Sequence, residues 1–288
     1  MVCAGNAACS IKKTVKTGVS PKILNAQTAT FEELLGILRG YDNINSLSSN
    51  DLRITLTTGK RESGEAQVYR SSPGYILLRR PDSLRLVVQL PVTKTAVLDL
   101  LSAGDDFSAW IPRENKFFTG INSAKVLVAE DLPDAPDLTI RATHIFEAIL
   151  PRSIALDAEG IRIAPEEAGD AEAKYYVLSV YRESAGPLML PVRKVWIERS
   201  RLTVSRQQVY GDEGRMVSDI TYAQGPPVDG FALPVKIRMD RPLDGYTLDL
   251  EFKTWRVNPD LPDKAFVLEP PPGAQIVPLK EKERSAAS

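Results

Sequence analysis

Alternation of apolar and polar residues runs through the chain and predicts a protein built mainly from antiparallel strands. The longest example is residues 194–222, where runs rich in Val, Ile, Thr, Tyr and Trp are separated by Ser200-Arg201 and by Gly211-Asp212-Glu213-Gly214. Gly and Asp tolerate tight reversals, so this segment predicts three consecutive strands, with Ile197 facing away from Trp196. Such a meander cannot bury its apolar face alone, and the rest of the chain must cover it.

Further strands are predicted on both sides of this segment. They are expected at residues 52–58, 66–70, 75–79, 84–90, 94–101, 107–111, 160–165, 175–182, 231–239 and 246–255. Ser71-Ser72-Pro73-Gly74 is expected to be a turn between two of them. Residues 166–172 are rich in Glu and Asp, which indicates a solvated acidic loop.

Two helices interrupt the strands. The first is predicted over Thr30–Tyr41, with Thr30 as the cap and acidic residues in its first turn. The second is predicted over Leu138–Leu150, where apolar residues recur at helical spacing until Pro151 stops them. The expected fold class is therefore mainly β (α+β), with one long, strongly curved antiparallel sheet.

The domain organisation follows from the same pattern. Residues 1–29 are expected to be an N-terminal tether, residues 30–279 a single domain, and residues 280–288 a charged, disordered tail. A hydrophobic content of 43% and a charged content of 25% are typical of a globular protein with a core. The net charge of -1, with Lys and Arg spread along the chain, indicates no nucleic-acid partner.

Few residues are available for catalysis or metal binding. His144 is the only histidine, and Cys3 and Cys9 are the only cysteines. A Cys-rich zinc site is therefore excluded from the body of the chain, and we expect no metal and no cofactor. His144 and Glu147 are spaced to share a helix face, but no nucleophile elbow or phosphate-binding loop accompanies them. A structural role for His144 is the favoured interpretation.

The N-terminus has two interpretations. Ala7-Ala8-Cys9-Ser10 resembles the end of a bacterial lipoprotein signal, which makes Cys9 a candidate for lipidation. The basic and apolar regions that normally precede such a site do not stand before it here. The alternative is that Cys3 and Cys9 are unpaired thiols in a flexible tail.

Several separated motifs resemble one family. These are Gln67-Val68-Tyr69-Arg70, the Arg-Pro step in residues 80–85, the strand and turn of residues 105–116, the segment 258–266 and the Pro-Pro-x-Gly of residues 269–273. In this order they are similar to the LolA/LolB superfamily of bacterial envelope proteins. The chain departs from the family pattern at Ile111-Pro112-Arg113, where the tyrosine is missing, and in additional residues at 165–174 and at the C-terminus.

The resemblance implies a half-open antiparallel β-barrel around an apolar cavity, with helices covering or plugging its concave face. It implies a non-enzymatic protein that binds acyl chains of lipids or acylated lipoproteins on the periplasmic side of the cell envelope, anchored to the outer membrane through a lipid on Cys9. The predicted cavity residues are apolar or aromatic strand residues, and the predicted lid residues come from the second helix. They are Leu84, Leu86, Val88, Leu90, Trp110, Trp196 and Ile197 for the cavity, and Ile145 and Phe146 for the lid.

Two alternatives stay open. One is a structural or regulatory envelope module that senses protein partners, and the other is an enzyme acting through His144. The basic pairs Arg79-Arg80 and Arg193-Lys194 allow contact with a lipid headgroup or a carboxylate, but solvated charge on edge strands is the favoured interpretation. The oligomeric state is not predicted by any of these patterns.

Overall fold

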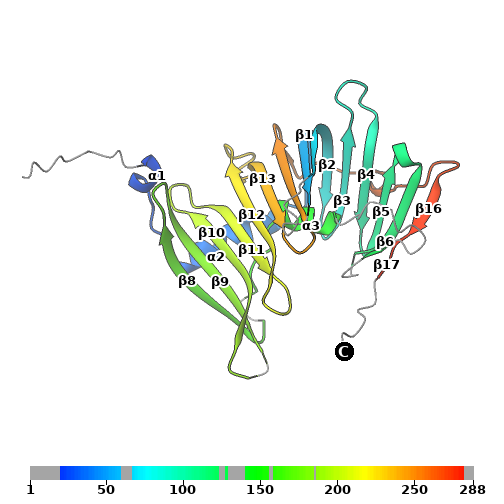
Figure 1. Cartoon of the computed structure of the whole chain (residues 1–288). Coiled ribbons are helices and arrows are strands. Elements are labelled where there is room, and N and C mark those ends of the chain that lie inside the picture. Colours follow the sequence, from blue (N-terminus) through cyan, green and yellow to red (C-terminus); the bar gives the residue numbers. More distant parts are fainter. Residues whose placement is uncertain are drawn as a thin grey trace, which may run out of the picture.

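The computed structural model describes residues 20–59, 67–122, 127–128, 140–155, 158–184 and 186–281. Within them, one 15-stranded sheet has the order β16-β6-β5-β4-β3-β2-β1-β14-β13-β12-β11-β10-β9-β8, and β15 pairs with β1. The order does not close on itself, so the sheet is open (Figure 1). Cys9 and the rest of the predicted anchor lie outside the described residues.

The strands of the first arm of the sheet are β2 (Gln67–Arg79), β3 (Ser83–Gln89), β4 (Ala96–Ala103), β5 (Asp106–Ile111), β6 (Lys116–Ile121) and β16 (Gln275–Pro278). Those of the second arm are β8 (Ile161–Gly169), β9 (Lys174–Glu183), β10 (Met189–Glu198), β11 (Thr203–Tyr210), β12 (Met216–Gln224), β13 (Pro234–Arg241) and β14 (Tyr246–Phe252). The strand β1 (Ser46–Thr58) joins the arms by pairing with β2 on one side and β14 on the other. β15 is Arg256–Val257, and β7 (Leu127–Val128) pairs with β17 (Lys280–Glu281) in a separate small sheet.

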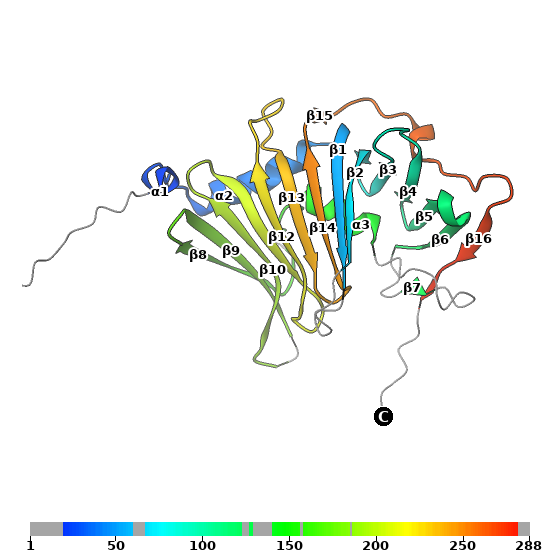
Figure 2. The ribbon, with the colours of Figure 1, turned by 45° about the horizontal axis from the view of Figure 1, so that its top comes forward.

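The sheet curves around the helix α3 (Ala142–Ile149), whose residues contact β3, β4 and β13. Four strands separate β4 from β13 in the sheet, a span of about 24 Å at the usual strand spacing. A helix of eight residues is only about 12 Å long. Because α3 reaches both strands, the sheet is concave on the side that carries the helix (Figure 2). We call this side the inner face and the opposite side the outer face.

The core fills the inner face. The helix α2 (Phe31–Gly40) begins with a capping box, in which Thr30 and Glu33 bond each other's backbone N–H groups. Leu34, Leu35 and Leu38 are buried and belong to the same apolar cluster as the inner residues of both arms. The predicted fold, a curved antiparallel sheet with helices on its concave face, is confirmed. No helix of the described chain is long and apolar enough to span a bilayer.

The outer face of the first arm is covered by the C-terminal segment around the short helix η3 (Asp263–Phe266). Arg85 forms a bidentate salt bridge with Asp99 and also donates to the carbonyl oxygens of Ala265 and Val267. Arg79 lies over the ring of Phe266 at 4.5 Å. Arg79 is therefore not the solvated edge-strand charge that the sequence favours, because it holds this segment in place.

Several predicted boundaries are wrong. Residues 71–74 do not form a turn, since β2 runs continuously from Gln67 to Arg79. The acidic residues 166–169 belong to β8 rather than to a loop, and Glu166 and Glu167 pair with Val177 and Tyr176 of β9. β8 lies at the end of the sheet, where outward charge is compatible with a strand.

The ends of three further predicted segments also differ. The second helix begins at Ala142, and residues 138–139 lie outside the described part of the chain. Within the predicted tether, Pro21–Leu24 form the short helix α1. Within the predicted tail, Lys280 and Glu281 form β17. The remaining short elements are the 3-10 turns η1 (Tyr41–Asn43) and η2 (Pro112–Glu114).

Candidate functional site

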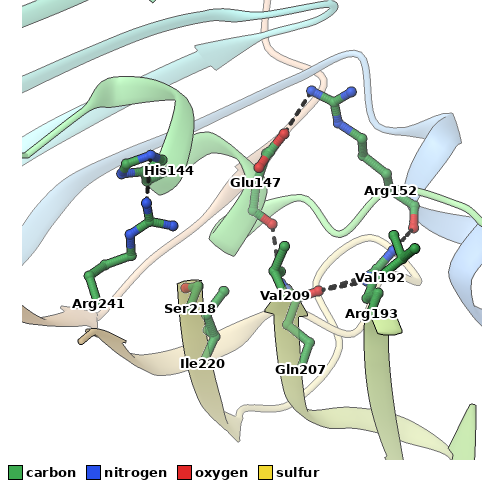
Figure 3. Close-up of a pocket in the computed structure, with 10 residues that line it drawn as sticks. All are labelled: His144, Glu147, Arg152, Val192, Arg193, Gln207, Val209, Ser218, Ile220 and Arg241. Atoms are coloured by element: carbon green, nitrogen blue, oxygen red, sulfur yellow. Dashed lines mark hydrogen bonds and ion pairs between the residues drawn. The ribbon is translucent and has the colours of Figure 1, made fainter. Parts of the chain in front are cut away.

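A cavity of about 160 Å³ lies between α3 and the inner face of β10, β11, β12 and β13. It combines apolar strand residues with several charged and polar side chains from five elements (Figure 3). The lining residues are His144, Glu147, Arg152, Val192, Arg193, Gln207, Val209, Ser218, Ile220 and Arg241. An engineered apolar cavity of about 150 Å³ accommodates benzene, so this space fits a small group rather than a long chain.

A hydrogen-bond network ties α3 to the strands at one side of the cavity. Nε and Nη2 of Arg193 donate to Oε1 of Gln207 at 3.2 and 2.8 Å. Nε2 of Gln207 donates to the hydroxyl of Tyr222 at 2.6 Å and to the carbonyl of Glu147 at 3.3 Å. The Tyr222 hydroxyl donates to the carbonyl of Ala148 at 2.8 Å. Burial raises the pKa of Tyr222, which keeps this phenol neutral.

His144 lies at the other side of the cavity with both ring nitrogens occupied. Nδ1 is 3.1 Å from the hydroxyl of Tyr246, and Nε2 is 3.0 Å from Nη2 of Arg241. Burial, helped by the nearby charges of Arg241 and Arg141, lowers the pKa of His144 well below 6.5. The imidazole is therefore held neutral between two partners, which supports the structural interpretation over a general base.

Two of the three arginines that line the cavity form ion pairs. Arg241 forms an ion pair with Asp244 at 2.7 Å, and Arg152 forms one with Glu147 at 2.9 Å. For Arg193, no ion pair is found within the described part of the chain. The prediction that Arg193 is solvated edge-strand charge is wrong, because β10 lies between β9 and β11 and the Arg193 side chain lines the cavity on the inner face.

The predicted cavity and lid residues lie elsewhere on the sheet and helix. Leu84 and Leu86 are buried in the core on β3, and Val88 packs against the same cluster. Leu90 follows the end of β3 and is 45% exposed. Ile145 and Phe146 are buried on α3. None of these residues lines the cavity of Figure 3, and their contact with a ligand stays a prediction.

The two predicted tryptophans point to the outer face. Ile197 is fully buried in the core, and strand alternation turns the preceding Trp196 away from it, under the guanidinium of Arg206. Trp196 lines a shallower outer depression of about 380 Å³ with charged residues such as Lys22 and Glu198, which are ion-paired. Trp110 lies beside Phe117, with ring centres 6.5 Å apart. The seven predicted cavity residues therefore do not share one face.

Sequence reasoning missed Gln207 and Ser218. Ser218 is only 3% exposed, yet its hydroxyl has no hydrogen-bond partner within the described part of the chain. The inward direction of Arg193 was predictable from the sequence, since alternation from Ile197 and Val195 places it on the inner face. The direction of Gln207 was not predictable in this way, because a β-bulge in β11 determines it.

The sequence matches no protein-family model and no curated protein. Similar solved structures include a DUF1329 family protein from Desulfovibrio piger, which is 15% identical, with a TM-score of 0.52 over 82% of this chain and 95% of that one. A LolA superfamily protein from Nitrosomonas europaea is 15% identical, with a TM-score of 0.49 over 84% of this chain and 99% of that one.

A putative outer membrane lipoprotein-sorting protein domain from Vibrio parahaemolyticus is 13% identical, with a TM-score of 0.49 over 82% of this chain and 96% of that one. At the level of fold, the chain shares the architecture of the Desulfovibrio piger protein.

Proposed function

We propose that this protein binds acyl chains of lipids or acylated lipoproteins, without catalysis, in the space between α3 and the inner face of the sheet. The observation that carries the proposal is the cavity beneath α3, in which Val192, Val209 and Ile220 supply an apolar wall. Each methylene group buried against such a wall contributes about 0.8 kcal/mol, so one long chain binds well without many polar contacts.

A long chain needs more room than about 160 Å³, so binding requires α3 to move. The helix contacts the sheet largely through apolar side chains such as Ile145 and Phe146. Its backbone accepts only a few side-chain hydrogen bonds, of which those from Gln207 and Tyr222 are described above. An acyl chain can replace the apolar contacts at little cost. In this proposal α3 is the lid, and Leu84 and Leu86 on β3 are among the residues uncovered when it leaves.

The cellular setting of the proposal comes from the sequence. The motifs that resemble the LolA/LolB superfamily imply the periplasmic side of the bacterial envelope, and lipidation of Cys9 would anchor the chain to the outer membrane. In that setting the protein would either deliver an acylated lipoprotein to a membrane surface or receive it there. A role in localising lipoproteins to the outer membrane is the specific form of this proposal.

The first test is to express the chain in a form that is not lipidated and extract it with organic solvent for lipid mass spectrometry. We expect co-purifying phospholipid or acylated peptide, and uptake of a fluorescent fatty acid by the emptied protein. Ile145→Trp, which overpacks a fully buried lid residue and so destabilises the closed position of α3, should speed that uptake. An empty extract with no uptake by a folded protein would contradict the proposal and favour a module that senses protein partners.

A further inference from the structure

Arg193 is a partly buried cation that forms no ion pair with a carboxylate of the described residues. Its three hydrogen bonds go to Oε1 of Gln207, twice, and to the carbonyl of Arg152 at 2.6 Å. Both acceptors are neutral groups, and no ion pair to Arg193 exists among the residues that the structure describes. Burying an unpaired charge is unfavourable, so such groups in proteins are normally paired or have a ligand.

The surrounding bonds leave donors of Arg193 available. A guanidinium has five N–H donors, so about two remain after the three bonds above. Gln207 accepts two of these bonds but does not neutralise the guanidinium, because its amide group carries no charge. The carboxylate of Glu147, which also lines the cavity, is paired with Arg152. Arg193 is therefore the unneutralised charge of this cavity.

A second group in the cavity also lacks a partner. Ser218 is only 3% exposed, and its hydroxyl makes no hydrogen bond to any residue that the structure describes. Arg193 lies opposite Val209, and Val209 lies opposite Ser218, so the three form one row across β10, β11 and β12. Two strand spacings put the Cα atoms of Arg193 and Ser218 about 10 Å apart. Both side chains line the same cavity (Figure 3).

We propose that this cavity binds the carboxylate of a fatty acid, with Arg193 as the charge partner and Ser218 as a hydrogen-bond donor. The cavity has room for a carboxylate and a few methylene groups, and Val209 lies between the two polar groups to contact them. The inference rests on the proposed function, because the acyl chain of the fatty acid would run beneath α3. It narrows that function to free fatty acids, because acyl chains held in esters or amides carry no carboxylate.

The test compares equilibrium binding of radiolabelled palmitate and methyl palmitate to the full chain at pH 8. The two ligands share one acyl chain, but only palmitate is charged. Because charge-assisted hydrogen bonds in a buried site are strong, the protein should prefer palmitate by about 10- to 100-fold. Arg193→Gln should reduce that preference to about 1 while methyl palmitate still binds. Arg162→Gln, at an exposed arginine of β8, is the control and should keep the preference.

Ser218→Ala gives an independent result, because the hydroxyl bonds to none of the described residues in the free protein. We expect unchanged stability and a preference for palmitate reduced severalfold. An unchanged preference in this variant, even if Arg193→Gln fails to fold, would overturn the site. Equal binding of palmitate and methyl palmitate to the unmodified chain would also overturn it, and would leave acyl binding intact. Binding of neither ligand would overturn the proposed function itself.

Discussion

Nη2 of Arg241 lies 3.0 Å from Nε2 of His144. A guanidinium only donates hydrogen bonds, so Nε2 accepts and carries no proton. The proton of the neutral ring is then on Nδ1, which donates to the hydroxyl of Tyr246 at 3.1 Å. The contact thus determines both the tautomer and the charge of His144, and it joins α3 to β13 and β14 through one side chain.

This arrangement predicts a loss of stability at mildly acidic pH. In the unfolded chain His144 takes up a proton near pH 6.5, whereas in the folded protein its pKa lies well below that value. Since the unfolded state binds the extra proton, the free energy of unfolding should fall by up to about 1.4 kcal/mol per pH unit below pH 6.5. Urea unfolding between pH 7.5 and 5.5 measures this slope. His144→Gln keeps an acceptor for Arg241 and should flatten the slope, and an equal slope in both proteins would contradict the assignment.

Gly74 lies in the middle of β2, where adding one methyl group should strongly destabilise the protein. A Cβ atom at this position would lie 2.3 Å from the carbonyl oxygen of Val87 in β3, so the two strands would have to separate. We expect Gly74→Ala to lower the free energy of unfolding by about 3 kcal/mol or more. Gly36→Ala is the matched control, because nothing lies within 4 Å of the added atom on helix α2. That variant should be more stable by about 0.5–1 kcal/mol.

Gly74 also illustrates what the sequence predicts well and what it does not. Ser71-Ser72-Pro73-Gly74 has the composition of a turn, yet the segment is a strand interior. Pro73 is tolerated because it pairs with Arg53 of β1 and the pairing of β2 with β3 begins only at Gly74, so no bond to β3 needs the N–H that proline lacks. Glycine serves here for the close approach of two strands. That approach depends on β3, so the local sequence carries no sign of it.

The cavity was predictable only in part. Alternation correctly separates Ile197 from Trp196, and the capping box of Thr30 and Glu33 marks the start of α2. Strict alternation from Val204, however, would turn Gln207 to the outer face. Ile197 pairs with Val204 and Trp196 with Arg206, so Ser205 is an extra residue that reverses the alternation. A bulge of this kind is a property of two paired strands, and a single strand's sequence does not reveal it.

The pair of Arg85 and Asp99 should be worth far more than an exposed ion pair. Asp99 is only 8% exposed, and removing Arg85 leaves its charge without a partner. We expect Arg85→Leu to lower the free energy of unfolding by about 3–5 kcal/mol. Arg162→Leu breaks the exposed pair with Glu183 and should cost less than about 1 kcal/mol. Chemical denaturation measures both, and similar losses in the two variants would show that the pair of Arg85 and Asp99 contributes no more than an exposed ion pair.

Replacing both members of the buried pair separates charge from structure. Arg85→Leu with Asp99→Leu leaves no unpaired carboxylate, so it should recover a large part of the loss. Recovery should be incomplete, because Arg85 also donates to the carbonyls of Ala265 and Val267 in the C-terminal segment. A double variant as unstable as Arg85→Leu alone would place the whole effect in those two backbone bonds.

Tyr222 gives a direct test of whether α3 must leave the sheet for a ligand to enter. Tyr222→Phe removes the bond to the carbonyl of Ala148 and the partner of Gln207, and should lower the free energy of unfolding by about 1–3 kcal/mol. If α3 is the lid, stopped-flow uptake of a fluorescent fatty acid should also become faster. Tyr210→Phe, which loses only a bond to Gln208 of its own strand, should leave the uptake rate unchanged. Lower stability without faster uptake would mean that the ligand enters without moving α3.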